Sequence, residues 1–222
     1  AFGTSDEIND MTFYRYKMIN RATEPIDSFH FSMWIDADLG CPDDDYIGCD
    51  TSNELMYVYN QDATDGIAGC NCQLTGGIVP TYCNEVPILG VDYFEGPLDE
   101  DGKEIGMSSF MYYNRTGTGP TGSVDPDGVI QYYRYLTGTW QDGTPLSVGG
   151  DGRTNSGEST RYAFFSPPDQ PGGWSMCEGN LPAGDRRTLQ TSGPFRLDPG
   201  RTNFLIIGVV WVPNYDYPCP NL

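Results

Sequence analysis

The stretch SFHFSMWIDADLGCPDDDYIGCD, residues 28–50, joins a clear strand pattern to a dense run of acidic residues. Its first eight residues alternate, so that one face of an extended chain carries Phe29, Phe31, Met33 and Ile35. A period of two is typical of a β-strand with one buried face. This strand leads directly into residues 36–50, where six aspartates stand without a basic residue.

Short strands joined by turns are predicted for the rest of the chain. The 222 residues include 28 Gly and 17 Pro, which leave little room for long helices. Further strands are expected at 11–19, 54–59, 90–94, 108–113, 161–165, 195–197 and 202–212, whereas 129–135 fits a strand or a short helix. This pattern favours one all-β domain over residues 1–222, a β-sandwich or jelly-roll-like fold with long loops. We expect it to be a fragment of a longer chain.

The charge of the chain excludes two classes of partner. There are 31 acidic residues against 12 basic ones, a net charge of −19. The field of such a protein repels phosphate, so nucleic acid and anionic membrane surfaces are poor partners. The longest apolar run, residues 204–212, is too short to span a membrane and suits a buried strand, so no direct membrane insertion is expected. The sign of the charge favours cations.

Seven cysteines in a turn-rich chain of this length indicate an oxidising compartment. We therefore expect disulfides and an extracellular or cell-surface location. An odd number leaves one cysteine free or paired outside the chain. A structural zinc site is the competing interpretation, with three thiolates closely spaced in the middle of the chain, although their spacing is uncommon for zinc. The disulfide candidates are Cys41, Cys49, Cys70, Cys72, Cys83, Cys177 and Cys219.

The acidic stretch is predicted to bind calcium. Calcium takes six to eight oxygen ligands from a loop that curls around the ion, and Gly40 permits a sharp bend after the first two aspartates. The stretch is not an EF-hand, because Ile47 stands where the twelfth-position glutamate would be. A solvated loop held by Asx turns, or a site for magnesium or manganese, are the alternatives. The predicted ligands are Asp36, Asp38, Asp43, Asp45 and Asp50, and residues 60–66 are a lesser candidate.

No catalytic constellation is apparent, so no enzyme activity is predicted. His30 is the single histidine and lies within a predicted strand, where a structural role is favoured. The serine-hydrolase elbow G-x-S-x-G is absent. The many acidic residues leave a glycosidase-type carboxylate pair open, but they do not place one. Sugar binding by stacking is a further possibility, with Trp34, Trp140 and Trp174 as the aromatic candidates.

Several sequence blocks, in one order, resemble a module of large secreted surface proteins from bacteria that use the type IX secretion system. The blocks are MTFYRYKMINR (11–21), SFHFSMWIDADLG (28–40), DDYIGCD (44–50), LMYVYNQD (55–62), VPILGVDYFEGP (86–97), MSSFMYYN (107–114), GDRRTLQTSGPFRLDPG (184–200) and IIGVVWV (206–212). The resemblance implies export and a place in a longer chain, and it implies no established enzyme activity. Relatives tend to carry a second cysteine in the block that holds Val58 here, so Cys41 is expected to pair with Cys49 instead.

Two classes of function follow from the sequence. The first is an extracellular, calcium-binding structural or adhesive surface module, whose partners would be other surface proteins, the secretion machinery or glycans. The second is a carbohydrate-binding or carbohydrate-processing domain.

Overall fold

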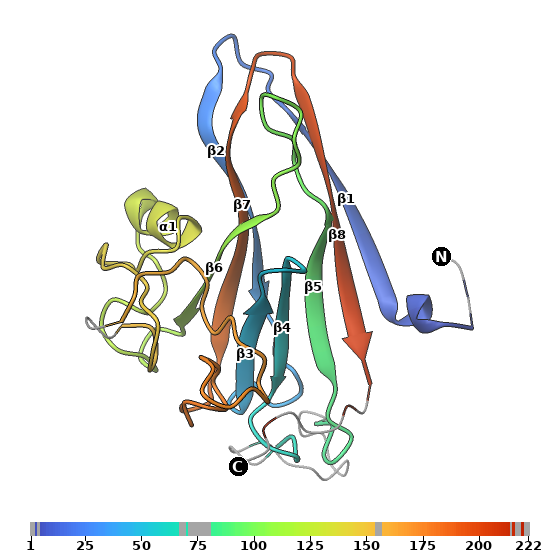
Figure 1. The fold of residues 1–222 in the computed structure, drawn as a ribbon, viewed down its shortest axis with the longest axis vertical. Coiled ribbons are helices and arrows are strands. Elements are labelled where there is room, and N and C mark those ends of the chain that lie inside the picture. The colour runs from blue at the N-terminus through green and yellow to red at the C-terminus, as the bar shows by residue number, and fades with distance from the viewer. Residues whose placement is uncertain are drawn as a thin grey trace.

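Two antiparallel β-sheets form the protein in the computed structural model, and two disulfides link its loops (Figure 1). The larger sheet has the strand order β1-β8-β5-β4-β3, and the smaller has the order β2-β7-β6. The prediction of a disulfide-containing, sandwich-like all-β fold is thus confirmed. The strands are β1 (Met11–Ile19), β2 (Ile26–Asp36), β3 (Asp45–Asp50), β4 (Leu55–Asn60), β5 (Ile88–Glu95), β6 (Met107–Asn114), β7 (Arg186–Leu197) and β8 (Thr202–Val212). The structure describes residues 3, 5–66, 70, 81–153, 157–213, 215 and 219.

Strand β2 follows the predicted alternation. Phe31, Met33 and Ile35 pack against the core, whereas Trp34 on the other face is 54 % exposed. The strand is irregular near its start, because its register against β7 shifts on both sides of Phe29. Ser28, within the first of these shifts, has a φ of 53°, an uncommon value for a residue other than glycine. The start of β2 is therefore bent, while its end runs regularly toward the acidic stretch.

Strand β3 lies inside the stretch that the sequence indicated to be a loop. It is the outer strand of the larger sheet, yet Tyr46, Ile47 and Cys49 are almost completely buried. The loop that precedes β7 covers its free edge: the Cys49 amide donates to the Phe164 carbonyl at 3.2 Å. Covering an edge in this way prevents pairing with another chain.

Three further expectations are corrected or refined by the structure. Residues 161–165 form no strand, and only an isolated bridge between Tyr162 and Phe110 remains there. Residues 129–135 adopt the helical alternative as α1 (Val129–Leu136), and 195–197 is the end of the long strand β7. A 3-10 turn, η1 (Glu7–Asp10), precedes β1.

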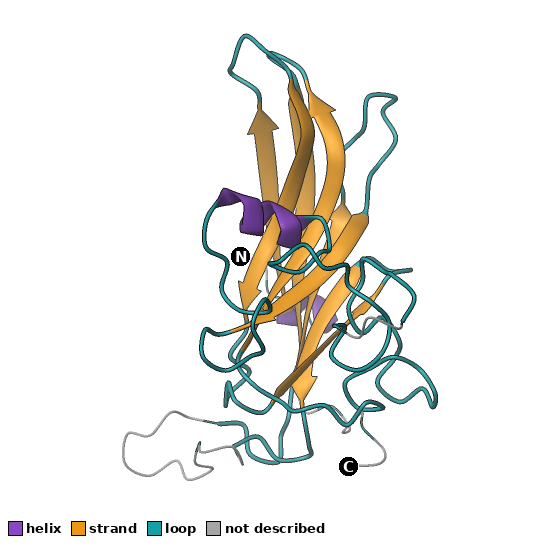
Figure 2. Cartoon of the chain, turned by 90° about the vertical axis from the view of Figure 1, so that its left-hand side faces the viewer, coloured by secondary structure: helices purple, strands orange, loops and turns teal. Residues whose placement is uncertain are grey.

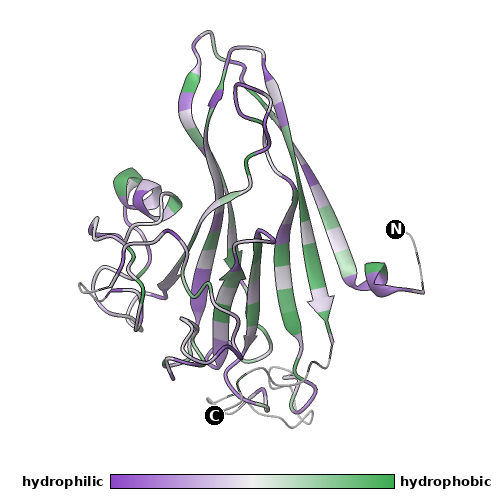
Figure 3. Cartoon of the chain, viewed as in Figure 1, coloured by the Kyte–Doolittle hydropathy of each residue, from purple (hydrophilic) through white to green (hydrophobic). Residues whose placement is uncertain are grey.

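Helix α1 lies across the strands on the side of β6 (Figure 2). It is anchored by Tyr135, which is fully buried and stacks on Tyr113 of β6 with ring centroids 5.0 Å apart. The hydrophobic residues that build the core are concentrated in the strands, and the surrounding loops are largely hydrophilic (Figure 3). Within the described part of the chain, no helix has the length and apolar character needed to cross a membrane.

Candidate metal centre

Three carboxylates converge where β2 ends and β7 begins. Asp36 closes β2 and is the register partner of Arg187 in β7, so the residues that flank both strands lie side by side. One oxygen from each of Asp36, Asp38 and Asp185 lies within 4.8 Å of the other two. Hard cations such as calcium prefer such oxygen ligands. This acidic cluster, defined as Asp36, Asp38 and Asp185, could therefore hold a divalent cation.

Two arginines partly neutralise the acidic cluster. Arg187 pairs with Asp36 at 3.3 Å and also with Asp185, and Arg115 pairs with Asp185 at 3.3 Å. Burial raises the pKa of Asp185, an effect that Arg187 opposes. Three carboxylates against two guanidinium groups leave one negative charge uncompensated, and a cation would neutralise it.

Asp38 is the member of the cluster most open to a cation. Its side chain makes no hydrogen bond or ion pair with any residue in the described part of the chain. Its backbone carbonyl accepts from the Gly40 amide at 3.0 Å, so the chain turns sharply just after it. The Asp38 carboxylate can thus bind an ion without first giving up a protein partner.

A second group of acidic side chains, Asp44, Asp45 and Asp65, is almost completely buried. These carboxylates hold the loop between β2 and β3, because each accepts a backbone amide. Asp45 accepts from Leu39 at 3.1 Å, and Asp65 accepts from Cys41 at 2.8 Å. Burial and the like charges of its acidic neighbours raise the pKa of Asp45 well above its usual value.

The glycine predicted to bend this loop is required by its contacts. Gly40 has a φ of +77°, and a Cβ atom there would lie 1.9 Å from a carboxylate oxygen of Asp65. The close approach lets Asp65 reach the Cys41 amide, which is the next residue along the chain. Gly40 thus acts through backbone geometry, as the sequence predicted.

Two buried oxygens in the β3–β4 pair have no hydrogen-bond partner among the described residues. They are Oδ1 of Asp45 and Oδ1 of Asn60. The two residues are register partners in the β3–β4 pair, so their side chains stand on the same face of the sheet. The amide oxygen of Asn60 and the carboxylate oxygen of Asp45 are further oxygens of the kind that bind cations, and they lie close to the end of the acidic loop.

The five predicted ligands are not gathered around one ion. Asp36 and Asp38 belong to the acidic cluster, and the charge of Asp43 acts on Asp185, whereas Asp45 lies in the buried group. Asp50 lies at the opposite end of β3, about 17 Å from Asp45 at the usual rise of a strand. Asp50 therefore lies apart from the acidic cluster, because the segment 45–50 is extended and separates its two ends.

Asp50 instead stabilises the turn between β3 and β4. Its carboxylate accepts from the Ser52 amide at 2.8 Å and from the Asn53 amide at 3.1 Å. Burial acts to raise the pKa of Asp50, but the hydrogen bonds from Asn53 and Ser52 outweigh it, and the pKa is lowered. This is the Asx-turn alternative that the sequence left open, realised at one position.

Asp50→Ala is expected to destabilise the protein by about 1 kcal/mol, the typical loss for such a side-chain-to-backbone hydrogen bond, while leaving any response to calcium unchanged. Because the folded pKa of Asp50 is lowered, its contribution is fully present above the unfolded pKa. The contribution is lost as the pH falls through the folded pKa. Urea denaturation of wild type and variant at pH 7 and pH 3 measures both effects. A calcium response that disappears with Asp50 would restore it as a ligand.

Asp185 is the member of the acidic cluster that sequence reasoning missed. It lies well over a hundred positions after Asp36, and nothing local distinguishes it from other aspartates in turns. The one available signal was its place directly before the double arginine that opens β7. Only strand pairing between β2 and β7 brings these positions together.

The disulfides place the cysteines differently from the expectation. Cys41 pairs with Cys70, not with Cys49, and Cys177 pairs with Cys219. Cys49 is a buried free thiol that donates to the Ala163 carbonyl at 3.4 Å, since β3 points it into the core. The Cys83 carbonyl accepts from Asp65 in the loop before β5, and Cys72 lies outside the described residues. The Cys41–Cys70 bridge ties down the acidic loop directly after Gly40.

Two of the three tryptophans considered for sugar stacking are unsuited to it. Trp140 is completely buried and Trp174 is 7 % exposed, so neither ring can offer a face to a ligand. Trp34 is exposed, and its indole nitrogen donates to the Tyr113 hydroxyl at 2.7 Å.

Comparisons with protein-family models, with curated proteins and with solved structures found no match.

Proposed function

We propose that the chain is an extracellular, calcium-stabilised structural or adhesive module of a longer surface protein. The observation that carries this proposal is the acidic cluster, in which Asp38 has an open carboxylate beside Asp36 and Asp185. The net charge of −19 adds to the attraction for a cation. In this role the ion is structural, since it joins the end of β2 to the start of β7.

Calcium suits this position better than magnesium. Calcium accepts six to eight ligands in flexible geometry, whereas magnesium demands a near-ideal octahedron and keeps several waters. Asp36 and Asp185 share oxygens with arginines, so their freedom to adjust around a small ion is limited. A larger ion can combine oxygens of the three carboxylates with waters.

Export to the cell surface is supported by chemistry as well as by the resemblance. Disulfides persist in oxidising surroundings, and two of them close loops at the same end of the molecule as the acidic cluster. The resemblance to modules of type IX-secreted proteins supports the same setting. Other surface proteins, the secretion machinery or glycans are the partners that such a module would meet.

Calcium is expected to raise the melting temperature of the wild-type protein by about 5–10 °C at a concentration a hundredfold above its Kd. That concentration corresponds to about 2.7 kcal/mol of linkage, and each kcal/mol is worth about 2–4 °C for a chain of this size. Asp38→Asn should abolish most of this shift, because it removes the open carboxylate without a change of shape. Differential scanning calorimetry with calcium, with magnesium and with excess chelator measures the effect.

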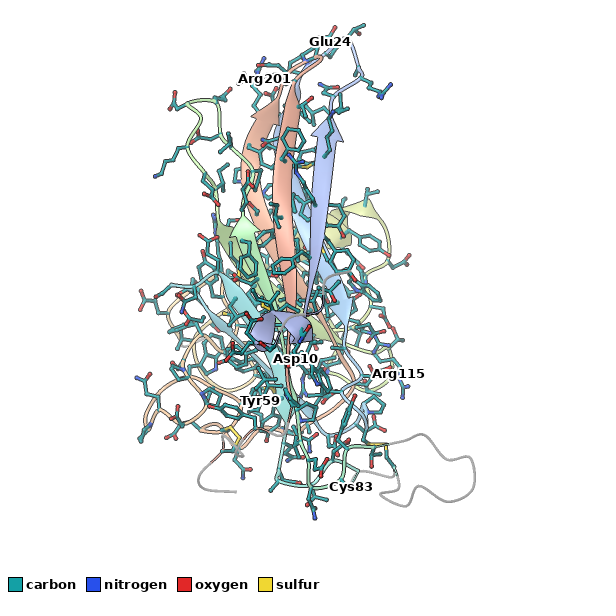
Figure 4. The ribbon with its side chains drawn as sticks, turned by 90° about the vertical axis from the view of Figure 1, so that its right-hand side faces the viewer. Asp10, Glu24, Tyr59, Cys83, Arg115 and Arg201 are labelled. Atoms are coloured by element: carbon teal, nitrogen blue, oxygen red, sulfur yellow. A yellow bond between two sulfur atoms is a disulfide. The ribbon has the colours of Figure 1, made fainter. Side chains whose placement is uncertain are left out.

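A matched control separates a site from general charge screening. Asp101 lies in an exposed turn and lines a cavity together with Arg201, which Figure 4 shows far from Arg115. Asp101→Asn removes the same charge and should keep the full calcium shift. Identical melting curves with calcium and with chelator would refute the proposal, as would an equal loss in both variants.

A further inference from the structure

Two adjoining cavities lie beside the end of α1. The first, of about 180 Å³, is lined by residues of β2, β6, β7 and the helix, among them His30 and Tyr133. The second, of about 580 Å³, opens between the loop after the helix and residues 159–162. They share Thr137 and Arg161, so they form one continuous groove, called here the helix groove. Figure 2 shows α1 lying across the strands on this face.

Among the residues that the structure describes, none that lines the helix groove is acidic, although the chain carries a net charge of −19. The two ionisable nitrogen groups of the groove are the guanidinium of Arg161 and the imidazole of His30. Within the described residues, no carboxylate oxygen lies within 4.0 Å of the Arg161 guanidinium. The cavity beside the β7–β8 turn differs, because Asp99, Glu100 and Asp101 line it together with arginines. The helix groove is therefore a place where an anion can approach a strongly acidic protein.

Hydroxyl groups are the second characteristic of the helix groove, and most of them already donate a hydrogen bond to a backbone carbonyl of the protein. Ser109 donates to the Leu136 carbonyl at 2.9 Å, Thr137 to the Tyr133 carbonyl at 3.1 Å, and Tyr162 to the Met107 carbonyl at 2.9 Å. Ser108 and Thr139 likewise donate to backbone carbonyls. A hydroxyl has one hydrogen to donate and two lone pairs, so each of these can only accept from a ligand. A matching ligand must bring several donors of its own.

His30 is held in one tautomer at the edge of the helix groove. Its Nδ1 lies 2.9 Å from the Ser28 carbonyl oxygen, which accepts only, so Nδ1 carries the hydrogen. In the neutral ring Nε2 is then an acceptor. The ring packs edge-on against Tyr133, whose side chain is 49 % exposed. The uncommon positive φ of Ser28 supports this arrangement, since such conformations gather at ligand-binding positions.

We propose that the helix groove binds an acidic sugar. The carboxylate or sulfate of the sugar would accept from the Arg161 guanidinium, whose planar fork suits bidentate pairing. The sugar hydroxyls would donate to these serines, threonines and tyrosine and to His30, and Tyr133 would offer an apolar face. A simple inorganic anion lacks the donors that this lining requires.

Isothermal titration calorimetry with trigalacturonic acid and with its methyl ester tests the proposal. The ester is the same sugar without the charge, so the difference in affinity reports the contribution of the carboxylates. The wild-type protein should bind the acid at least tenfold more tightly than the ester. Arg161→Ala should weaken binding of the acid at least tenfold and leave the ester unaffected. Arg161→Lys should fall between, because it keeps the charge and loses the fork. A sulfated chondroitin disaccharide, run in parallel, distinguishes a sulfate-bearing ligand from a carboxylate-bearing one.

Arg201→Ala is the matched control, because Arg201 lies outside the helix groove, in the separate cavity that acidic residues line beside the β7–β8 turn. It should leave binding unchanged, and all variants should melt with the wild-type protein. Equal affinity for acid and ester, binding of neither charged sugar, or an equal loss with Arg201→Ala would each overturn the proposal. These outcomes are independent of the calcium experiment, so the two can fail separately.

Discussion

Replacing Trp140 by alanine is expected to lower the free energy of unfolding by about 3–5 kcal/mol, the usual range for a buried tryptophan. The Trp140 ring is completely buried and packs edge-on against Tyr112, with ring centroids 5.3 Å apart. Its indole nitrogen donates to the Gly152 carbonyl at 3.0 Å, so truncation also removes a buried hydrogen bond. Loss of packing and of this hydrogen bond act together.

Trp34→Ala is the matched control for the same side chain at an exposed site. Trp34 is 54 % exposed, and we expect its removal to cost about 1 kcal/mol or less, mainly through its hydrogen bond to Tyr113. Chemical denaturation followed by circular dichroism gives both values. Equal losses for the two variants would show that the loops around Trp140 do not pack as described.

Removing the Cys41–Cys70 disulfide is expected to destabilise the protein by about 3–4 kcal/mol, as the loop-closure model gives for cysteines 29 positions apart. The loss of calcium affinity should also be larger than the loss that follows removal of the other described disulfide. Cys41 follows Gly40 directly, and its amide donates to Asp65, so the bridge fixes the loop that carries Asp38. The Cys41→Ser/Cys70→Ser double variant should therefore bind calcium more weakly.

The second disulfide provides the comparison. Cys177→Ser/Cys219→Ser removes a bridge with a separation of 42 positions and a similar expected loss of stability. It should keep the calcium affinity, because it closes a different loop. Calorimetric titration of both double variants with calcium, at a temperature where both are folded, measures the contrast. Equal calcium affinity in the two double variants would contradict the expectation that the first disulfide supports calcium binding by the acidic loop.

The fold could be predicted where one strand shows its own alternation. In residues 28–35, Phe31, Met33 and Ile35 pack against the core whereas Trp34 is exposed, and their period of two is visible in the sequence. Strand β3 could not be found in this way, because both of its faces are buried and its acidic start resembles a loop. Its Gly48 also reads as a turn residue. In the structure it is needed because a Cβ there would lie 2.6 Å from the Tyr57 ring.

The candidate site was predicted only in part, for a related reason. The density of aspartates in residues 36–50 was visible, and Asp36 and Asp38 belong to the acidic cluster. Asp185 was not identified, because its proximity depends on the pairing of β2 with β7. Local sequence reports which residues can bind a cation, whereas strand pairing decides which of them meet.

The most direct test of the central claim is an anomalous-difference map from crystals grown in calcium and soaked with terbium, which replaces calcium at carboxylate sites. We expect a peak at calcium-like distances, about 2.3–2.6 Å, from oxygens of Asp36, Asp38 and Asp185, and no such peak in Asp38→Asn crystals. A map without a peak at the acidic cluster, in crystals where those carboxylates face solvent, would contradict the account.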